Sequence, residues 1–314
     1  MGWWPYAVAG GMLATLFLVW LVLELKTSRP DGTPIKVHPY RKLMAFVMRG
    51  RNESIVFFDS YIPADEITRY LEVARGKFGA NLTHAVVAAV SVAIAENPPL
   101  NRFTVGKRLY QRKGRHITFS MKRQKANKKA KLAAVKLKMD NNESFRELAE
   151  RINSHITIER SGKKTYADKE FALFNAVPRP ILELAVTLFK LADYYNMLPG
   201  SFIESDGMYT SCFVANLGSL QMGAGYHHLY EWGNCPIFVM VGQVEDRPAV
   251  VNGEVVAQSC LHVRYSMDER IADGINARVA VASMGRVLRD PFKELGCLAD
   301  DGSDRVSLGP KAEE

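Results

Sequence analysis

Residues 7–23 form an uninterrupted apolar segment, AVAGGMLATLFLVWLVL, which contains no charged side chain. A helix of this length measures about 26 Å, which is close to the roughly 30 Å hydrocarbon core of a bilayer. Backbone groups in lipid must satisfy their own hydrogen bonds, so the segment is expected to be helical. Trp3, Trp4 and Tyr6 precede it, where aromatic side chains suit the membrane–water boundary. We therefore predict a transmembrane anchor over residues 1–26, with residues 3–25 in the membrane.

A cleaved signal peptide is the alternative interpretation of this segment. Signal peptides carry a basic region before the apolar run and a small-residue cleavage site after it. No Lys or Arg precedes Ala7, and the following LELKTSRPDG offers no such site. The residues after the apolar run carry many cations instead: Lys26, Arg29, Lys36, Arg41, Lys42, Arg49 and Arg51. Because positive charge stays on the cytoplasmic side, we predict a single-pass protein with its N-terminus outside and its C-terminal domain in the cytoplasm.

The rest of the chain is long enough for one large domain or two fused halves. Residues 27–37, with two prolines, are predicted to be a linker, residues 38–297 the folded domain and residues 298–314 a disordered tail. The four cysteines are widely spaced and form no Cys-x-x-Cys pair: Cys212, Cys235, Cys260 and Cys297. This usage favours free thiols in a reducing compartment.

A basic run between residues 122 and 138 accounts for much of the net charge of +8. It contains no acidic residue and eight cations: Lys122, Arg123, Lys125, Lys128, Lys129, Lys131, Lys136 and Lys138. Such a run is most often a solvated loop or an exposed strand face. The functional alternatives are an anionic ligand, an anionic lipid surface or an acidic partner. No nucleic acid is expected as a partner, because the run has no interleaved aromatic side chains and no nucleic-acid-binding motif.

The apolar pattern of the domain alternates between strand and helix signals. Strands are predicted at 55–62, 103–110, 116–121, 132–139 and in several short apolar runs after residue 209, with a hairpin turn at Asn252-Gly253. Helices are predicted after Ala64-Asp65, at 82–95, from Ser144, at 178–198 and at 276–288. This order of elements predicts an α/β fold of the α+β kind, with a mixed sheet flanked by helices.

The predicted helix at 178–198 is apolar but is interrupted by Glu183, Lys190 and Asp193, so it is not a spanning segment. Burial in the domain is the default interpretation. The alternative is that it lies in the membrane interface beside the anchor.

Several short motifs occur in a fixed order in the second half of the chain. They are N-L-G at 216–218, G-Q-V-E-D-R-P at 242–248, V-N-G-E-V-V at 251–256, D-E-R-I-A-D-G at 268–274 and L-R-D-P at 288–291. Together with AIAENPPLN at 93–101, they resemble the catalytic domain of the E2 acyltransferases of 2-oxo acid dehydrogenase complexes, which is related to chloramphenicol acetyltransferase. The resemblance covers about residues 38–296.

This resemblance implies a chloramphenicol acetyltransferase-like fold, preceded here by one N-terminal transmembrane helix. It also implies homotrimers or higher assemblies with active sites between subunits, and acyl transfer between a thiol such as coenzyme A and an acceptor. In that family a histidine removes a proton from the thiol or hydroxyl group, and a serine or threonine donates a hydrogen bond to the oxyanion. The aspartate of the motif holds the backbone through an arginine pair.

Both chemical positions differ in this chain. The histidine position holds Glu269 and the oxyanion-donor position holds Ala215, whereas Arg270 and Asp273, the two architectural residues, are retained. A carboxylate becomes a useful base only where burial raises its pKa. Thr210, Ser211 or Ser219 would be substitute donors, and His227 or His228 a substitute base, although the strand and turn positions of the three hydroxyls point them in different directions.

The binding predictions follow from the same resemblance. Coenzyme A or acyl-CoA is the expected ligand, with no covalent cofactor, no lipoyl group and no metal. The residues expected to bind it are Lys122, Arg123, Lys125, Lys128, Lys129, Asn216 and Gly218. Since no lipoyl domain is recognised before the fold and residues 166–208 form an insertion, membership in an ordinary dehydrogenase complex is not expected.

Two functional hypotheses remain open at this point. In the first, the chain keeps the acyltransferase fold as a catalytically degenerate scaffold or ligand binder, with membrane-associated protein partners. In the second, it is an active acyltransferase that uses Glu269 as a base on a membrane-borne acceptor.

If the basic run binds the phosphates of coenzyme A, affinity should fall as salt is added, because salt screens exposed charges. We expect Lys128→Ala with Lys129→Ala to weaken binding as well. Calorimetric titration at low and high salt measures both effects. Binding that is indifferent to salt and survives the double substitution would exclude this role.

Overall fold

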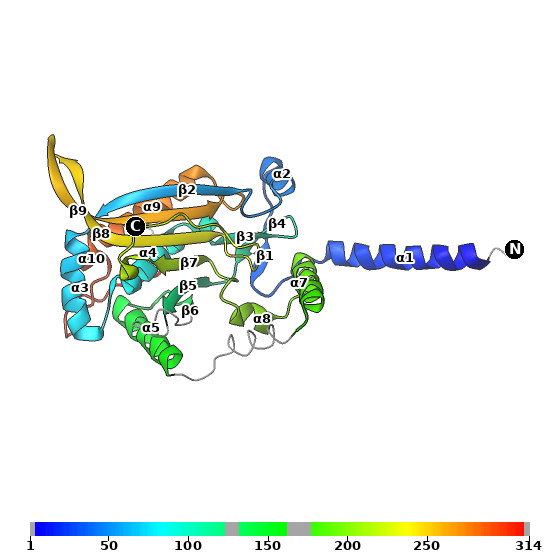
Figure 1. Ribbon diagram of the computed structural model, residues 1–314, viewed down its shortest axis with the longest axis horizontal. Coiled ribbons are helices and arrows are strands. Elements are labelled where there is room, and N and C mark those ends of the chain that lie inside the picture. Colours follow the sequence, from blue (N-terminus) through cyan, green and yellow to red (C-terminus); the bar gives the residue numbers. More distant parts are fainter. Residues whose placement is uncertain (1–3, 123–131, 162–176, 311–314) are drawn as a thin grey trace.

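The computed structural model describes residues 4–122, 132–161 and 177–310. Its centre is a six-stranded mixed sheet in the order β2-β9-β8-β7-β5-β6. The strand bounds are β2 Ile55–Pro63, β5 Arg115–Lys122, β6 Leu132–Met139, β7 Cys212–Asn216, β8 Ile237–Val251 and β9 Glu254–Asp268. Strand β7 runs parallel to β5 and β8, and the other neighbours pair antiparallel. The expected α/β fold with a mixed sheet is therefore confirmed (Figure 1).

Helices cover one face of this sheet and form the main core with it. They are α3 Asp65–Phe78, α4 Leu82–Glu96, α5 Phe145–Arg160, α9 Gly274–Arg289 and the short α10 Pro291–Glu294. Helix α4 is apolar on nearly every side and most of its residues are buried, as its sequence predicts. Alternation along β8 sends Val239 and Val241 into this core, while Phe238 and Met240 pack on the other face.

Two segments differ from their predictions because strands far apart in the sequence pair with each other. They are the linker at 27–37 and the single strand at 103–110. Residues 103–110 form two strands, β3 Arg102–Val105 and β4 Arg108–Arg112, that turn at Gly106-Lys107. Strand β1, Gly32–Pro34, pairs with β4 and completes a small three-stranded sheet beside the 3-10 helix Pro98–Asn101. The segment predicted as a linker over 27–37 is thus part of the fold, because its extended backbone finds a partner strand that lies far along the sequence.

The predicted disordered tail is also wrong for its described part, up to residue 310. The Leu308 side chain is buried, and its backbone N–H donates to the Glu143 carbonyl at 2.9 Å. The Asp304 carboxylate accepts from the N–H groups of Leu298 and Ala299 at 2.7 and 3.1 Å. The polar residues of this segment therefore satisfy backbone donors, which composition alone does not reveal.

Helix α1, Trp4–Leu25, extends away from the domain (Figure 1), and its large apolar side chains from Tyr6 to Trp20 are exposed. Within the described residues it is long and apolar enough to cross a membrane. Two further helices lie near the point where α1 meets the domain: α2 Pro39–Val47, which the sequence analysis missed, and α7 Arg179–Tyr194, which is followed by α8 Gly200–Ser205. The prediction that the helix at 178–198 is buried is wrong for α7, which has no buried residue.

A buried ionic cluster attaches the end of α1 to the domain. Arg29 donates to the Asp31 carboxylate at 2.7 Å and lies 3.1 Å from the Asp193 carboxylate. Its guanidinium also lies over the ring of Phe103. Burial alone would raise the pKa of Asp31, but the hydrogen bond and positive charge of Arg29 hold it below its usual value. Three parts of the chain therefore meet at one cation: the segment after α1, the small sheet and α7.

Replacing Arg29 with alanine should destabilise the fold, because the Asp193 carboxylate, only 13% exposed, would lose its cation and Asp31 would keep only Arg112, at 3.5 Å. The expected loss in the free energy of unfolding is about 3–5 kcal/mol. The matched control is Arg69→Ala, which removes an exposed ion pair with Glu66 and should cost about 1 kcal/mol or less. Denaturant unfolding of the full chain in detergent measures both. Equal losses for the two variants would contradict the role given to Arg29.

Candidate functional site

The end of strand β9 carries the first group of predicted site residues. Asp268 and Arg270 are 1% and 5% exposed and form a two-pronged ion pair, with N–O distances of 2.8 and 2.7 Å. The Ser54 hydroxyl donates to the same carboxylate at 2.9 Å. The Arg270 guanidinium also donates to the Met48 and Arg49 carbonyls. Arg270 therefore joins β9 to the chain that follows α2, and its carboxylate partner is Asp268, which the sequence analysis did not single out.

Glu269 lies between these two buried residues but is itself only partly buried. Its contacts are made by the backbone: its N–H donates to the Ser54 carbonyl at 2.9 Å, and its carbonyl accepts from Arg41 at 3.3 Å. Its carboxylate has no hydrogen bond or ion pair with the residues that the structure describes. The side chain is thus free to meet a ligand or another subunit.

Asp273 has an architectural role at the start of α9. Its carboxylate accepts from the Asn276 backbone N–H at 3.1 Å and from the Asn276 side chain at 2.6 Å, which makes it the N-cap of the helix. These hydrogen bonds, the backbone one above all, lower the pKa of Asp273. Its arginine neighbour is Arg41, at 3.9 Å, and not Arg270.

Strand β7 carries the second group of predicted residues. Ala215 offers only a methyl group and lies opposite Met240 of β8. The Asn216 side chain donates to the Thr83 hydroxyl at 3.0 Å. At Gly218 a Cβ would lie 2.5 Å from the Gly242 carbonyl, so the backbones approach too closely for any side chain. Asn216 therefore ties β7 to α4, Gly218 allows the close approach to β8, and neither contact indicates a cofactor.

The three hydroxyls that could replace a missing oxyanion donor are occupied elsewhere. Thr210 donates to the His116 carbonyl at 2.7 Å, Ser211 to the Asn101 side chain at 2.6 Å, and Ser219 to the Asn216 carbonyl at 2.8 Å. Thr210 and Ser211 are also fully buried. In this conformation none of the three is available to a substrate oxygen.

Of the two adjacent histidines, His227 packs against the sheet and His228 is exposed. His227 stacks on Phe238 with ring centroids 4.1 Å apart, and its carbonyl accepts from the Ser266 hydroxyl at 2.6 Å. Burial lowers the pKa of His227. His228 lies 4.8 Å from the ring of Tyr230 and contacts the Leu229 carbonyl through Nδ1. These contacts are those of packing residues.

The two altered catalytic positions lie far apart within one chain. Ala215 aligns with Met240, and Met240 aligns with Arg264 of β9. Glu269 follows Arg264 by five residues, which amounts to about 17 Å along an extended strand. A site that used both positions would therefore take one from each of two chains.

Most of the predicted basic binding residues lie outside the described residues: Arg123, Lys125, Lys128 and Lys129. The backbone of Lys122 ends β5. Further along the same run, Lys136 is a structural cation, because its ammonium group donates to the Ile203 and Asp206 carbonyls at 2.7 and 3.1 Å. Burial lowers its pKa to about 8. No cluster of His, Cys, Asp or Glu suited to a metal occurs in the described part of the chain.

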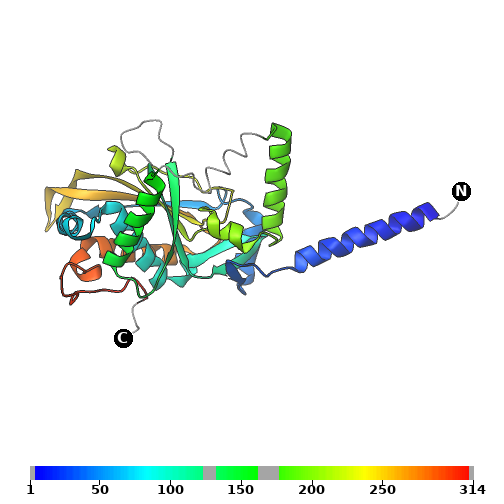
Figure 2. The same ribbon diagram turned by 90° about the horizontal axis from the view of Figure 1, so that it is seen from below.

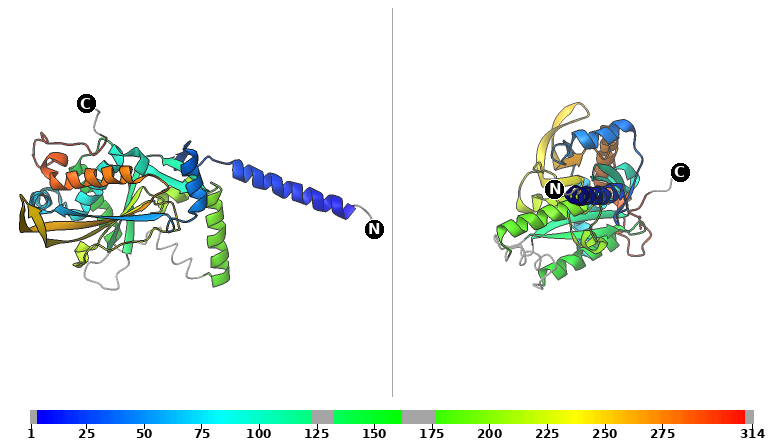
Figure 3. Two further views of the ribbon diagram at one scale, coloured as in Figure 1. Left: turned by 90° about the horizontal axis from the view of Figure 1, so that it is seen from above. Right: turned by 90° about the vertical axis from the view of Figure 1, so that its right-hand side faces the viewer.

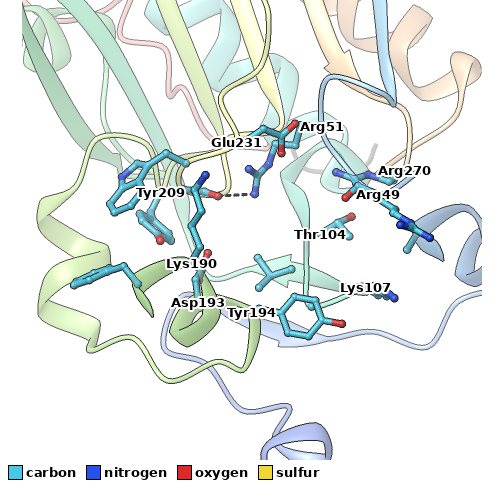
Figure 4. A pocket seen from close by; sticks show the side chains of 16 residues that line it. Arg49, Arg51, Thr104, Lys107, Lys190, Asp193, Tyr194, Tyr209, Glu231 and Arg270 are labelled. Atoms are coloured by element: carbon cyan, nitrogen blue, oxygen red, sulfur yellow. Dashed lines mark hydrogen bonds between the residues drawn. The ribbon is translucent and has the colours of Figure 1, made fainter. Parts of the chain in front are cut away.

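The structure also contains a pocket of about 280 Å³ that the sequence did not indicate (Figure 4). Its walls come from α2, the turn between β3 and β4, α7 and the loop at 231–233. Five cations line it, against the two acids Asp193 and Glu231: Arg49, Arg51, Lys107, Lys190 and Arg270. Lys190 and Asp193 lie on one side of the pocket, and Arg49, Lys107 and Arg270 on the other. Only Arg49 and Arg51 of the cations that follow the anchor line this pocket, together with residues from much later in the chain.

Residues 200–295 match the model of the 2-oxoacid dehydrogenases acyltransferase (catalytic domain) family. Among solved structures, a probable dihydrolipoamide acetyltransferase from Listeria monocytogenes is 17% identical, with a TM-score of 0.56 over 85% of this chain and 98% of that one. The dihydrolipoamide acetyltransferase of Azotobacter vinelandii is 17% identical, with a TM-score of 0.53 over 82% and 93%. A chloramphenicol acetyltransferase is 12% identical, with a TM-score of 0.50 over 82% and 99%.

At these identities the structural likeness establishes the fold, and the family match covers the segment that holds Ala215 and Glu269. The chain has the fold of the dihydrolipoamide and chloramphenicol acetyltransferases, and its residues 200–295 are similar to the catalytic domain of the 2-oxoacid dehydrogenase acyltransferases.

Proposed function

We propose that this chain is a membrane-anchored protein that retains the acyltransferase fold without its transfer chemistry. In this proposal it serves as a scaffold, or as a binder of coenzyme A or an acyl-CoA, for partners at the membrane. The observation that carries it is the state of β7. Ala215 has no donor, and the hydroxyls of Thr210, Ser211 and Ser219 are engaged in structural hydrogen bonds.

The energetic weight of that observation is large. Removal of one oxyanion donor typically slows acyl transfer by about 10²- to 10³-fold. The replacement of histidine by Glu269 removes the group whose pKa suits proton transfer near neutral pH. Meanwhile the buried pair of Asp268 and Arg270 and the N-cap Asp273 are intact. A scaffold needs the residues that hold the fold, and it does not need the residues that transfer an acyl group.

A homotrimer or higher assembly is part of the proposal. It is supported by the separation of Ala215 and Glu269 along the sheet, because a family-type site would then need one residue from each of two subunits. The partly exposed Glu269 carboxylate, without a partner in the described residues, then lies where another subunit could cover it.

Membrane attachment is the third part of the proposal, with α1 as a single-pass span and the domain in the cytoplasm. It is supported by the exposed apolar surface of α1 and by the cations that follow it. The four cysteines agree with a reducing compartment, since all four are buried free thiols.

One observation favours a second candidate, an active acyltransferase that uses Glu269 as its base. The Glu269 side chain has no role in holding the fold, since its structural contacts use only its backbone. A base that acted on a membrane-borne acceptor would need such a free carboxylate.

Thiol release from acetyl-CoA and longer acyl-CoAs by the purified full chain distinguishes the two candidates. We expect the wild-type rate to equal that of buffer. Glu269→His combined with Ala215→Ser should create turnover when both groups are present, exceeding either single variant by about 10²-fold or more. Wild-type turnover that is abolished by Glu269→Gln would overturn the scaffold proposal and establish the second candidate.

A further inference from the structure

The turn between β3 and β4 is the junction of three helices at one end of the domain. At Gly106, a Cβ would lie 2.4 Å from the Tyr194 carbonyl at the end of α7. The Lys107 ammonium lies 4.9 Å from the centre of the Phe46 ring in α2. Next to them, Arg108 pairs with Glu24 at the end of α1 at 3.0 Å. Helices α2 and α7 are therefore neighbours of the point where α1 leaves the domain.

The orientation of α1 relative to this end is held by further contacts. The Asn196 side chain, just after α7, donates to the Lys26 carbonyl at 2.9 Å. Arg29 lies 3.1 Å from Asp193 of α7. Because α1 and α7 share these bonds, placing α1 across a bilayer also decides where α7 lies. In two perpendicular views α7 runs across the direction of α1 (Figures 2 and 3).

Helix α7 carries an exposed apolar stripe. Four large side chains are 51–59% exposed: Ile181, Leu184, Leu188 and Leu191. At about 100° per residue they fall within about 80° of the helix circumference. The charged Arg179, Glu183 and Lys190 lie on another side of the helix. The stripe ends at Leu191, and the Tyr194 carbonyl after it lies against the same turn that holds Glu24 of α1 through Arg108.

Helix α2 repeats this pattern on the other side of the turn. Its exposed apolar residues are Tyr40, Leu43, Phe46 and Val47, and they fall within about 120° of the helix. On another side, Arg41 donates to the Glu269 and Arg270 carbonyls, which fixes α2 to the end of β9. Two short amphipathic helices that flank a spanning helix are suited to the membrane interface.

The pocket described above lies between these two helices and has an excess of positive charge. Arg51 and Arg270 are engaged with protein groups, and Asp193 is engaged with Arg29. Arg49, Lys107 and Lys190 have no carboxylate partner among the described residues, and they face the pocket from both sides (Figure 4). The lining also includes Phe189 and Trp232. A site whose cations lack a carboxylate partner, with apolar side chains beside them, suits an anionic amphiphile.

We propose that α2 and α7 lie in the headgroup layer around α1 and that the pocket between them binds the headgroup of an anionic phospholipid. The inference rests on the membrane anchor of the proposed function. An isologous contact with a second copy would bring the same three cations together, whereas anionic headgroups neutralise them.

The position of α7 can be measured in the full chain reconstituted into liposomes of phosphatidylcholine and phosphatidylserine. The four native thiols are buried, so a nitroxide can be attached to Leu188→Cys alone. The matched control is Val250→Cys near the β8–β9 turn, where the apolar side chain is 72% exposed. We expect the label at 188 to be more accessible to oxygen than to a water-soluble nickel chelate, and the label at 250 to show the reverse.

The pocket is tested by co-purification of phosphatidylserine with the full chain from these liposomes, quantified by mass spectrometry. Arg49→Gln with Lys190→Gln should reduce the retained phosphatidylserine by about tenfold or more, given the loss of two cations near the surface. Arg69→Gln with Lys293→Gln, two cations far from the pocket, should leave it unchanged. Equal retention by all three proteins would overturn the headgroup site.

Failure of the anchor and failure of this docking surface give different results. If alkaline carbonate releases the protein from liposomes, the anchor is wrong and the inference falls with it. If the protein stays in the membrane but the label at 188 behaves like the label at 250, the anchor stands and the docking surface is wrong. If the label is inaccessible to both reagents, a protein surface covers the stripe, which also overturns the proposal.

Discussion

One buried cation, Arg29, determines how the apolar helix is joined to the folded domain. It holds Asp31 and Asp193 and lies over Phe103, so the end of α1, the small sheet and α7 meet around it. A buried ion pair gives little net stability, because the cost of desolvating the two charges offsets their attraction. Removing one partner, however, leaves the other charge unpaired in the interior. Its effect here is geometric. The cluster converts what composition suggests is a flexible linker into a rigid joint, so that any surface near α1 has a fixed orientation relative to that helix.

A second buried pair, Asp268 with Arg270, acts in the same way at the end of β9. It links the sheet to the backbone after α2 and leaves Glu269 between two immobile neighbours. Substitution of Asp268 or Arg270 would leave the other residue as an unpaired buried charge. Glu269, in contrast, contributes only backbone hydrogen bonds to the fold. The fold therefore depends strongly on the side chains of Asp268 and Arg270 and little on the side chain of Glu269. That difference explains how a chain can keep the motif around this position while the residue at its centre changes.

Sequence patterns predicted the elements whose environment is set locally. The alternating strand β6, the apolar α4 ended by Pro98 and the turn at Asn252-Gly253 all occur as expected. The failures involve distant partners: β1 pairs with a strand some eighty residues away, the tail after 298 folds back onto Glu143, and α7 is exposed although apolar. The motifs placed Glu269 and Ala215 in one site, but strand register separates them within a chain. The pocket could not be predicted, because short segments from across the chain line it.

The two ends of the sheet face different surroundings once α1 spans a bilayer. Arg41 ties α2 to the carbonyls of Glu269 and Arg270, so the Glu269 end of β9 lies on the same side of the domain as the helix junction. Ala215 lies several residues further along the sheet, away from that junction. With the proposed anchor in a bilayer, the Glu269 part of a composite site would lie nearer the lipid surface than the Ala215 part of the same chain. A long acyl-CoA, which has a lipid-like part and a soluble part, would fit such a site better than a small soluble acceptor. The proposed anchor would thereby limit which ligands the fold can bring together.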